Sequence, residues 1–139
     1  MIKASISMAQ QIAEAAITFQ KLRTGHTPKS ATVVLSEDTL VITLHGALSK
    51  AEKVMAKDPA GAAQLQEFHK QLFALSSDWM RQEIKRITGV EVREATAEVE
   101  TCTGTVVQAF TTGTMVQVYL LASDVPTETW SGSKANKPL

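Results

Sequence analysis

The chain lacks most of the features that would place it in a specialised class of protein. Its single cysteine, Cys102, rules out an internal disulfide and favours a reducing compartment. Basic and acidic residues balance at 14 each, so there is no net charge to collect nucleic acid or an anionic membrane. No segment approaches the roughly 18 to 20 consecutive apolar residues that span a bilayer. These absences predict a cytoplasmic protein that does not cross the membrane and does not bind nucleic acid.

Metal and cofactor motifs are also missing. The three histidines, His26, His45 and His69, have no carboxylate or thiol at a recognisable metal-ligand spacing. The loop at residues 25–30 contains Gly, Lys and Ser, but without the spacing of a phosphate-binding P-loop. We therefore expect no metal, no cofactor and no catalytic residues.

What the sequence does contain is strong helix periodicity. Apolar residues at spacings of three and four predict an N-terminal helix over about residues 3–23 and a long central helix over residues 59–88. Gly25 and Gly89 are suited to end these helices, and Pro28 prevents the first from resuming. The long helix carries two neighbouring apolar stripes and is expected to bend at Ser76–Ser77 or to project into a partner. So wide an apolar face predicts a homodimer.

Between these helices lies a helix-start signal. Ser49-Lys50-Ala51-Glu52 matches the capping box, in which the serine hydroxyl and the glutamate carboxylate each accept a backbone N–H. It predicts a short helix over residues 50–57. The adjacent Glu52 and Lys53 resemble an acid–base pair, but neighbouring helical residues point about 100° apart. The capping role therefore explains Glu52 better than catalysis does.

The remaining segments alternate as strands do. Residues 31–36 and 39–46 predict a hairpin around a short acidic turn, and residues 90–100, 105–112 and 114–122 are rich in Val and Thr. A change of phase predicts a bulge or a break near Arg93–Glu94. We expect an α+β fold of order α-β-β-α-α-β-β, with an antiparallel sheet of about four strands packed against the N-terminal and long central helices. Residues 1–122 form one domain, and residues 123–139 form a flexible polar tail.

A few residues are candidates for binding. If the second strand of the hairpin alternates, His45 faces away from Ile42 and Leu44, so that His45, with His26 and Lys29 nearby in the chain, could bind a small ligand. The alternative is an ordinary hydrogen-bonded histidine. Trp130 in the polar tail could anchor a partner protein, or it could be incidental.

The ordered motifs of the chain resemble the bacterial MpsC family. The resemblance covers roughly residues 5–95, and the positions that carry it are these: Gly25, Pro28, Asp38, Gly46, Leu48, Ser49, Glu52, Lys53, Thr88 and Gly89. The chain departs from the family pattern at Thr27, where a second glycine is usual. It departs again in the second half, where residues 92–114 form a longer and differently composed segment.

The resemblance implies an association with a sodium-translocating, membrane-potential-generating system. It brings no catalytic residues to this chain. We therefore expect a non-enzymatic cytoplasmic accessory or regulatory protein of a membrane ion or bicarbonate transport system, possible contact with a membrane transport subunit, and a location that can be peripheral to the membrane. Two alternatives stay open: a small-ligand binder or enzyme that uses the surface around His45, and an interaction module that acts through the tail.

Overall fold

The computed structural model describes residues 7–111 of the chain. Its elements follow the predicted order: α1 (Met8–Thr24), β1 (Ser30–Ser36), β2 (Thr39–His45), α2 (Lys50–Met55), α3 (Pro59–Thr88), β3 (Glu94–Glu100) and β4 (Thr105–Thr111). The α+β prediction is therefore confirmed. The strand predicted at residues 114–122, the polar tail and Trp130 lie outside the described residues.

Helix α1 begins later than the sequence pattern suggested. Ser7 has an extended backbone, and its side chain accepts a hydrogen bond from the backbone N–H of Gln10 at 3.0 Å. A serine in this role is an N-cap, which is where a helix starts. The predicted start near residue 3 was therefore wrong, whereas the predicted end is close: Gly25 closes the helix in the left-handed conformation, with φ 82°.

Within the described residues, the four strands form one antiparallel sheet of order β1-β2-β4-β3. The two hairpins, β1–β2 and β3–β4, meet through their second strands, so that Ile42 lies opposite Gln108. The β1–β2 turn has two residues, and Glu37 adopts a positive φ of 54° there. The predicted break before β3 is also present, because residues 90–93 lie outside the strand.

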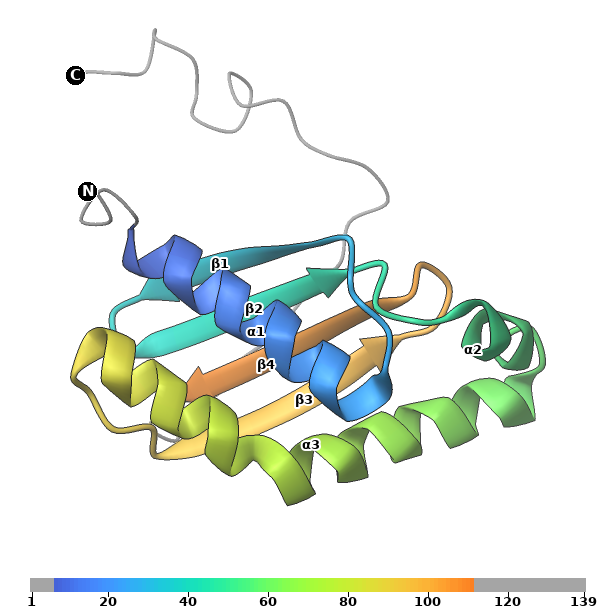
Figure 1. Ribbon diagram of the computed structural model, residues 1–139. Coiled ribbons are helices and arrows are strands. Elements are labelled where there is room, and N and C mark those ends of the chain that lie inside the picture. Colours follow the sequence, from blue (N-terminus) through green and yellow to red (C-terminus); the bar gives the residue numbers. More distant parts are fainter. Residues whose placement is uncertain (1–6, 112–139) are drawn as a thin grey trace, which may run out of the picture.

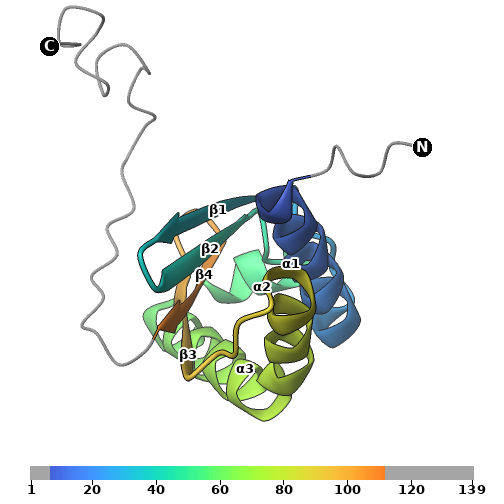
Figure 2. The same ribbon diagram turned by 90° about the vertical axis from the view of Figure 1, so that its left-hand side faces the viewer.

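Both long helices cover the same face of the sheet (Figure 1). Seen end-on, the molecule has two layers, with α1 and α3 on one side and the strands on the other (Figure 2). Leu40, Ile42 and Leu44 point into the space between the layers and are buried, whereas the residues between them are half-buried. This alternation places His45 on the face that the sequence predicted.

The middle of this core is aromatic. Phe19 of α1 packs edge-on against Phe73 at 6.2 Å and is stacked on Trp79 at 5.9 Å, both from α3. Met80 is fully buried nearby in α3. These contacts join the two helices over the sheet.

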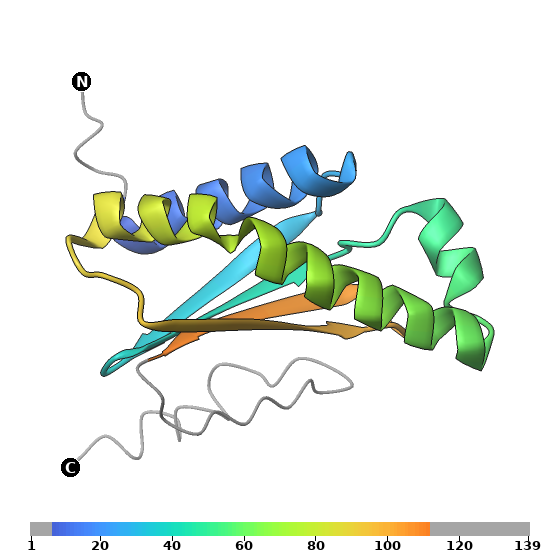
Figure 3. The same cartoon turned by 90° about the horizontal axis from the view of Figure 1, so that it is seen from below.

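Helix α3 changes direction near the middle of its length (Figure 3). There the Ser76 hydroxyl donates to the carbonyl of Leu72, four residues earlier, at 2.5 Å. Serine side chains that bond back to the preceding turn often bend helices. Such a bend is what the sequence suggested at this position.

Candidate functional site

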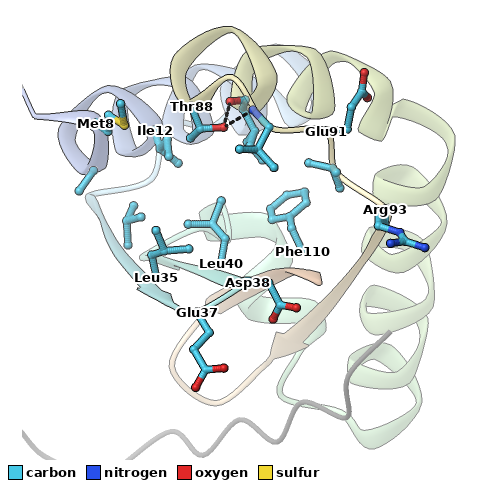
Figure 4. A pocket seen from close by; sticks show the side chains of 15 residues that line it. Met8, Ile12, Leu35, Glu37, Asp38, Leu40, Thr88, Glu91, Arg93 and Phe110 are labelled. Atoms are coloured by element: carbon cyan, nitrogen blue, oxygen red, sulfur yellow. Dashed lines mark hydrogen bonds between the residues drawn. The ribbon is translucent and has the colours of Figure 1, made fainter. Parts of the chain in front are cut away.

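An apolar cavity of about 280 Å³ opens at one end of the two-layer core (Figure 4). Five parts of the described chain meet there: the first turns of α1, the β1–β2 hairpin, the last two turns of α3, the chain that follows α3 into β3, and the end of β4. Gly89 ends α3 with φ 81°, so the chain leaves the helix and returns to the sheet along one side of the opening. The cavity is therefore formed where these elements begin and end.

Carbon atoms form the interior of the cavity. Ile12 comes from α1, Ile84 from α3, and Leu40 and Phe110 from the two central strands, and all four are buried. Figure 4 shows Ile12 approaching from the helix layer while Leu40 and Phe110 approach from the sheet. A cavity with such walls favours apolar groups, because a polar group placed inside would exchange its bonds to water for contacts with carbon.

Among the described residues that line the cavity, Thr88 supplies the one side-chain hydroxyl group, and it already has partners. The Thr88 side chain donates to the carbonyl of Ile84 at 2.7 Å and accepts from the backbone N–H of Val90 at 3.1 Å. It therefore holds the end of α3 in place. Binding of an apolar group is the chemistry that this wall supports.

Charged and exposed apolar residues both line the mouth. Glu37 and Asp38 lie on the hairpin side and Arg93 lies just before β3, at the other edge of the sheet. Glu91 forms an ion pair with Lys85 of α3 at 2.5 Å. Met8, Leu35 and Val90 also line the cavity and are 56%, 67% and 64% exposed. We call these three residues the apolar collar.

A second, much smaller cavity lies deeper in the molecule. The buried polar side chains of Gln20, His69 and Gln108 meet Arg23 around a space of about 10 Å³. That volume suits a single water-sized molecule at most. The apolar cavity of about 280 Å³ is therefore a better candidate than this one for binding another molecule.

The residues predicted to bind a ligand gather elsewhere. His26 Nε2 lies 3.0 Å from the carbonyl oxygen of Gly46, and His45 Nε2 lies 2.9 Å from the Thr32 hydroxyl. The backbone N–H of Lys29 donates to the carbonyl of His45 at 2.8 Å. This corner is at the end of β2, whereas the cavity is beside its start. The ligand-binding role of His26, Lys29 and His45 stays a prediction.

The corner also explains the glycine that follows His45. Gly46 has φ 61°, and a Cβ placed there would lie 2.8 Å from Cγ of Lys29. Gly46→Ala should lower the free energy of unfolding by about 1 to 2 kcal/mol through backbone strain, with crowding of Lys29 added. Gly25→Ala is the matched control, because Gly25 has φ 82° but nothing within 4 Å of its added Cβ. Equal losses in urea unfolding would show that Lys29 packing contributes nothing.

The capping box is joined to a contact that sequence reasoning missed. The Glu52 carboxylate accepts the backbone N–H of Ser49 at 2.9 Å, and its other oxygen lies 2.8 Å from Nε2 of His69. The side chain of His69 is 3% exposed, so α2 is tied to a buried residue of α3. The two residues are 17 positions apart, and no local pattern relates them.

These contacts give Glu52 a dependence on pH. Burial raises the pKa of Glu52, but the hydrogen bonds from Ser49 and His69 outweigh it and hold the pKa below the ordinary value of 4.5. As the pH falls, the Glu52 carboxylate is protonated first in the unfolded chain. The stabilisation is therefore complete above about pH 5, and it is lost progressively as the pH falls below 4.5 and through the lowered pKa of the folded state. Glu52→Gln should therefore reduce the loss of unfolding free energy between pH 5 and pH 3.

Urea unfolding at several pH values measures this slope. The Glu52→Gln variant should still lose some unfolding free energy in acid, because Glu100 also has a lowered pKa. The main cause is the hydrogen bond that Glu100 accepts from the Thr103 side chain. Identical pH profiles for the variant and the unchanged protein would contradict the role given to Glu52.

Residues 7–111 contain no group of three or more His, Cys, Asp and Glu side chains that could hold a metal ion. Over the same residues, no helix is both long enough and apolar enough to cross a membrane.

A family model described as "Na+-translocating membrane potential-generating system (MpsC)" matches residues 5–129 of the chain. The chain belongs to the MpsC family. The match extends well beyond residue 95, so the differently composed second half also falls within the MpsC model. Neither the curated proteins nor the solved structures contain a significant match.

The structure shows what several of the MpsC motif positions do in this chain. Gly25, Gly46 and Gly89 occupy left-handed turns, and Ser49 and Glu52 form the capping box. These positions begin and end elements. These five do not line the apolar cavity, whereas two other motif positions, Asp38 and Thr88, do.

Proposed function

We propose that this chain is a non-enzymatic accessory or regulatory protein of a Na+-translocating membrane system and that it acts from the cytoplasm. The observation that carries the proposal is the MpsC family match over residues 5–129. The cavity is consistent with such a role, because its apolar walls and collar are suited to binding and offer little for acid–base chemistry.

A membrane-recruitment experiment tests the proposal. The full chain carrying an affinity tag is expressed in its source organism, cross-linked in living cells and isolated from the membrane fraction. We expect one or more membrane proteins of an ion-translocating system to be recovered, and we expect deletion of this gene to reduce a Na+-dependent membrane potential. Absence of the chain from the membrane fraction, together with an unchanged potential, would overturn the proposal.

The same proposal includes a homodimer. Phe68 and Leu75 are seven residues apart on α3, so they share a face, and they are 50% and 86% exposed. A large exposed apolar side chain in the middle of a helix is well placed to pack against a second copy. We therefore expect two α3 helices to pair through this face.

Sedimentation equilibrium checks the dimer. The average mass should rise with concentration toward that of two chains, and Leu75→Glu should keep the protein at the mass of one chain. Ala63→Glu places the same charge at an exposed position on a different face of α3 and should leave the association unchanged. A monomer at every concentration would remove this part of the proposal.

A further inference from the structure

The apolar surface at the large cavity continues out through its mouth. Large exposed apolar side chains line this opening: Met8, Leu35 and Val90. A small molecule inside the cavity would leave the collar in water. An occupant that covers both the interior and the collar must be larger than the cavity itself.

The shape and chemistry of the cavity indicate which part of the occupant enters. The buried walls are carbon, and the hydroxyl of Thr88 is already bonded to Ile84 and Val90. A peptide backbone inside would lose its hydrogen bonds, so only side chains are suited to enter. A helix satisfies its own backbone and presents an apolar face, which is the common way that a hydrophobic groove binds a peptide.

The volume sets the number of side chains. An apolar cavity of about 150 Å³ is known to accept one benzene molecule, so the 280 Å³ found here corresponds to about two ring-sized groups. Two bulky side chains three or four residues apart lie on the same face of a helix. The cavity therefore fits a pair of apolar anchors one helical turn apart.

Charge then orients the helix. Glu37 and Asp38 flank the mouth on the hairpin side, and Arg93 flanks it on the β3 side. Figure 4 shows these side chains at the rim of the apolar interior. A helix with Lys or Arg next to its anchors would meet the Glu37 carboxylate, and an acidic residue at its other side would meet Arg93.

We propose that the cavity and its collar bind an amphipathic helix of a partner protein, with two bulky apolar side chains one turn apart and a basic residue facing Glu37. That this helix belongs to a membrane subunit of an ion-translocating system rests on the proposed function. The binding chemistry itself does not.

The test uses a phage-displayed library of random 16-residue peptides, selected on the full-length protein. We expect enrichment of sequences with two large apolar residues at a spacing of three or four and a neighbouring Lys or Arg. A synthetic copy of a selected peptide is then titrated by calorimetry against two variants. Ala9→Trp blocks the cavity from the first turn of α1, and Gln10→Trp is the control at the next exposed position, which does not line the cavity.

The expected dissociation constant rises at least tenfold for Ala9→Trp and is unchanged for Gln10→Trp. Glu37→Lys should weaken binding most at low salt, because it reverses a charge at the rim. No enriched pattern, or equal binding by the Ala9→Trp variant, would overturn the inference. Binding of decanoate to the cavity with no selected peptide would also overturn it and would identify a site for a small apolar ligand.

The two proposals fail differently. If Ala9→Trp protein is still recovered with the membrane fraction while the peptide no longer binds, the proposed function stands and a helix bound in the cavity is not what recruits the chain. If no peptide pattern appears but the membrane potential falls on deletion of the gene, only the cavity inference is lost.

Discussion

Replacing Phe19 by alanine should lower the free energy of unfolding by about 4 kcal/mol, within the range for buried aromatic residues. Phe19 is 2% exposed and contacts both Phe73 and Trp79 of α3. Arg23 also lies over its ring, 5.2 Å from the centre. Removal of the ring leaves a cavity between α1, α3 and the sheet that these side chains are too constrained to fill.

Urea unfolding followed by circular dichroism measures this loss. Leu22→Ala is the matched control, because Leu22 is on the same helix but is 61% exposed, and it should change the stability by no more than about 0.5 kcal/mol. Similar losses for the two variants would mean that α1 does not pack on α3 through Phe19.

His69→Ala should be the second most damaging change, with an expected loss of about 3 kcal/mol. The substitution removes a buried ring and also the partner of the Glu52 carboxylate, so a cavity term adds to a lost hydrogen bond to a charged group. Because Glu52 also caps α2, we expect the loss to be accompanied by loosening of residues 49–55.

Hydrogen exchange of the Ser49 and Glu52 amides, with the unfolding free energy, checks this result. Lys70→Ala is the control, since Lys70 is the next residue of α3 and its side chain is 55% exposed. Unchanged protection of both amides in His69→Ala would show that α2 does not depend on α3 for its position.

Much of the fold could be predicted because its signals are local. Gly25 and Gly89 end helices through their own backbone freedom, and the Ser49–Glu52 box spans four residues. Alternation along β2 likewise depends on neighbouring residues. Each of these features is specified by a short stretch of chain, so it can be read without knowing what packs on it.

The candidate site could not be predicted, for the opposite reason. Ile12, Leu40, Ile84 and Phe110 come from four elements, and only the strand order β1-β2-β4-β3 brings them together. Apolar residues form no sequence motif that would mark a binding site. Sequence reasoning therefore selected histidines, which have distinctive chemistry, and so pointed to the other end of β2.

The contact between Glu52 and His69 illustrates the same limit. The sequence explained Glu52 through the capping box and placed His69 on the long helix, but their meeting depends on how α2 folds back beside α3. The start of α1 was misplaced because an apolar stripe does not mark the first residue of a helix, whereas the Ser7 side chain caps the helix at that position.

The role that we propose for this MpsC-family chain is support of a Na+-translocating membrane system. Its most direct test is the Na+-dependent membrane potential of vesicles from cells that lack the gene, measured with a voltage-sensitive dye before and after the purified chain is added to the cytoplasmic side. We predict a reduced potential that the added chain restores. A potential equal to that of vesicles from unmodified cells, and unaffected by the added chain, would contradict this role.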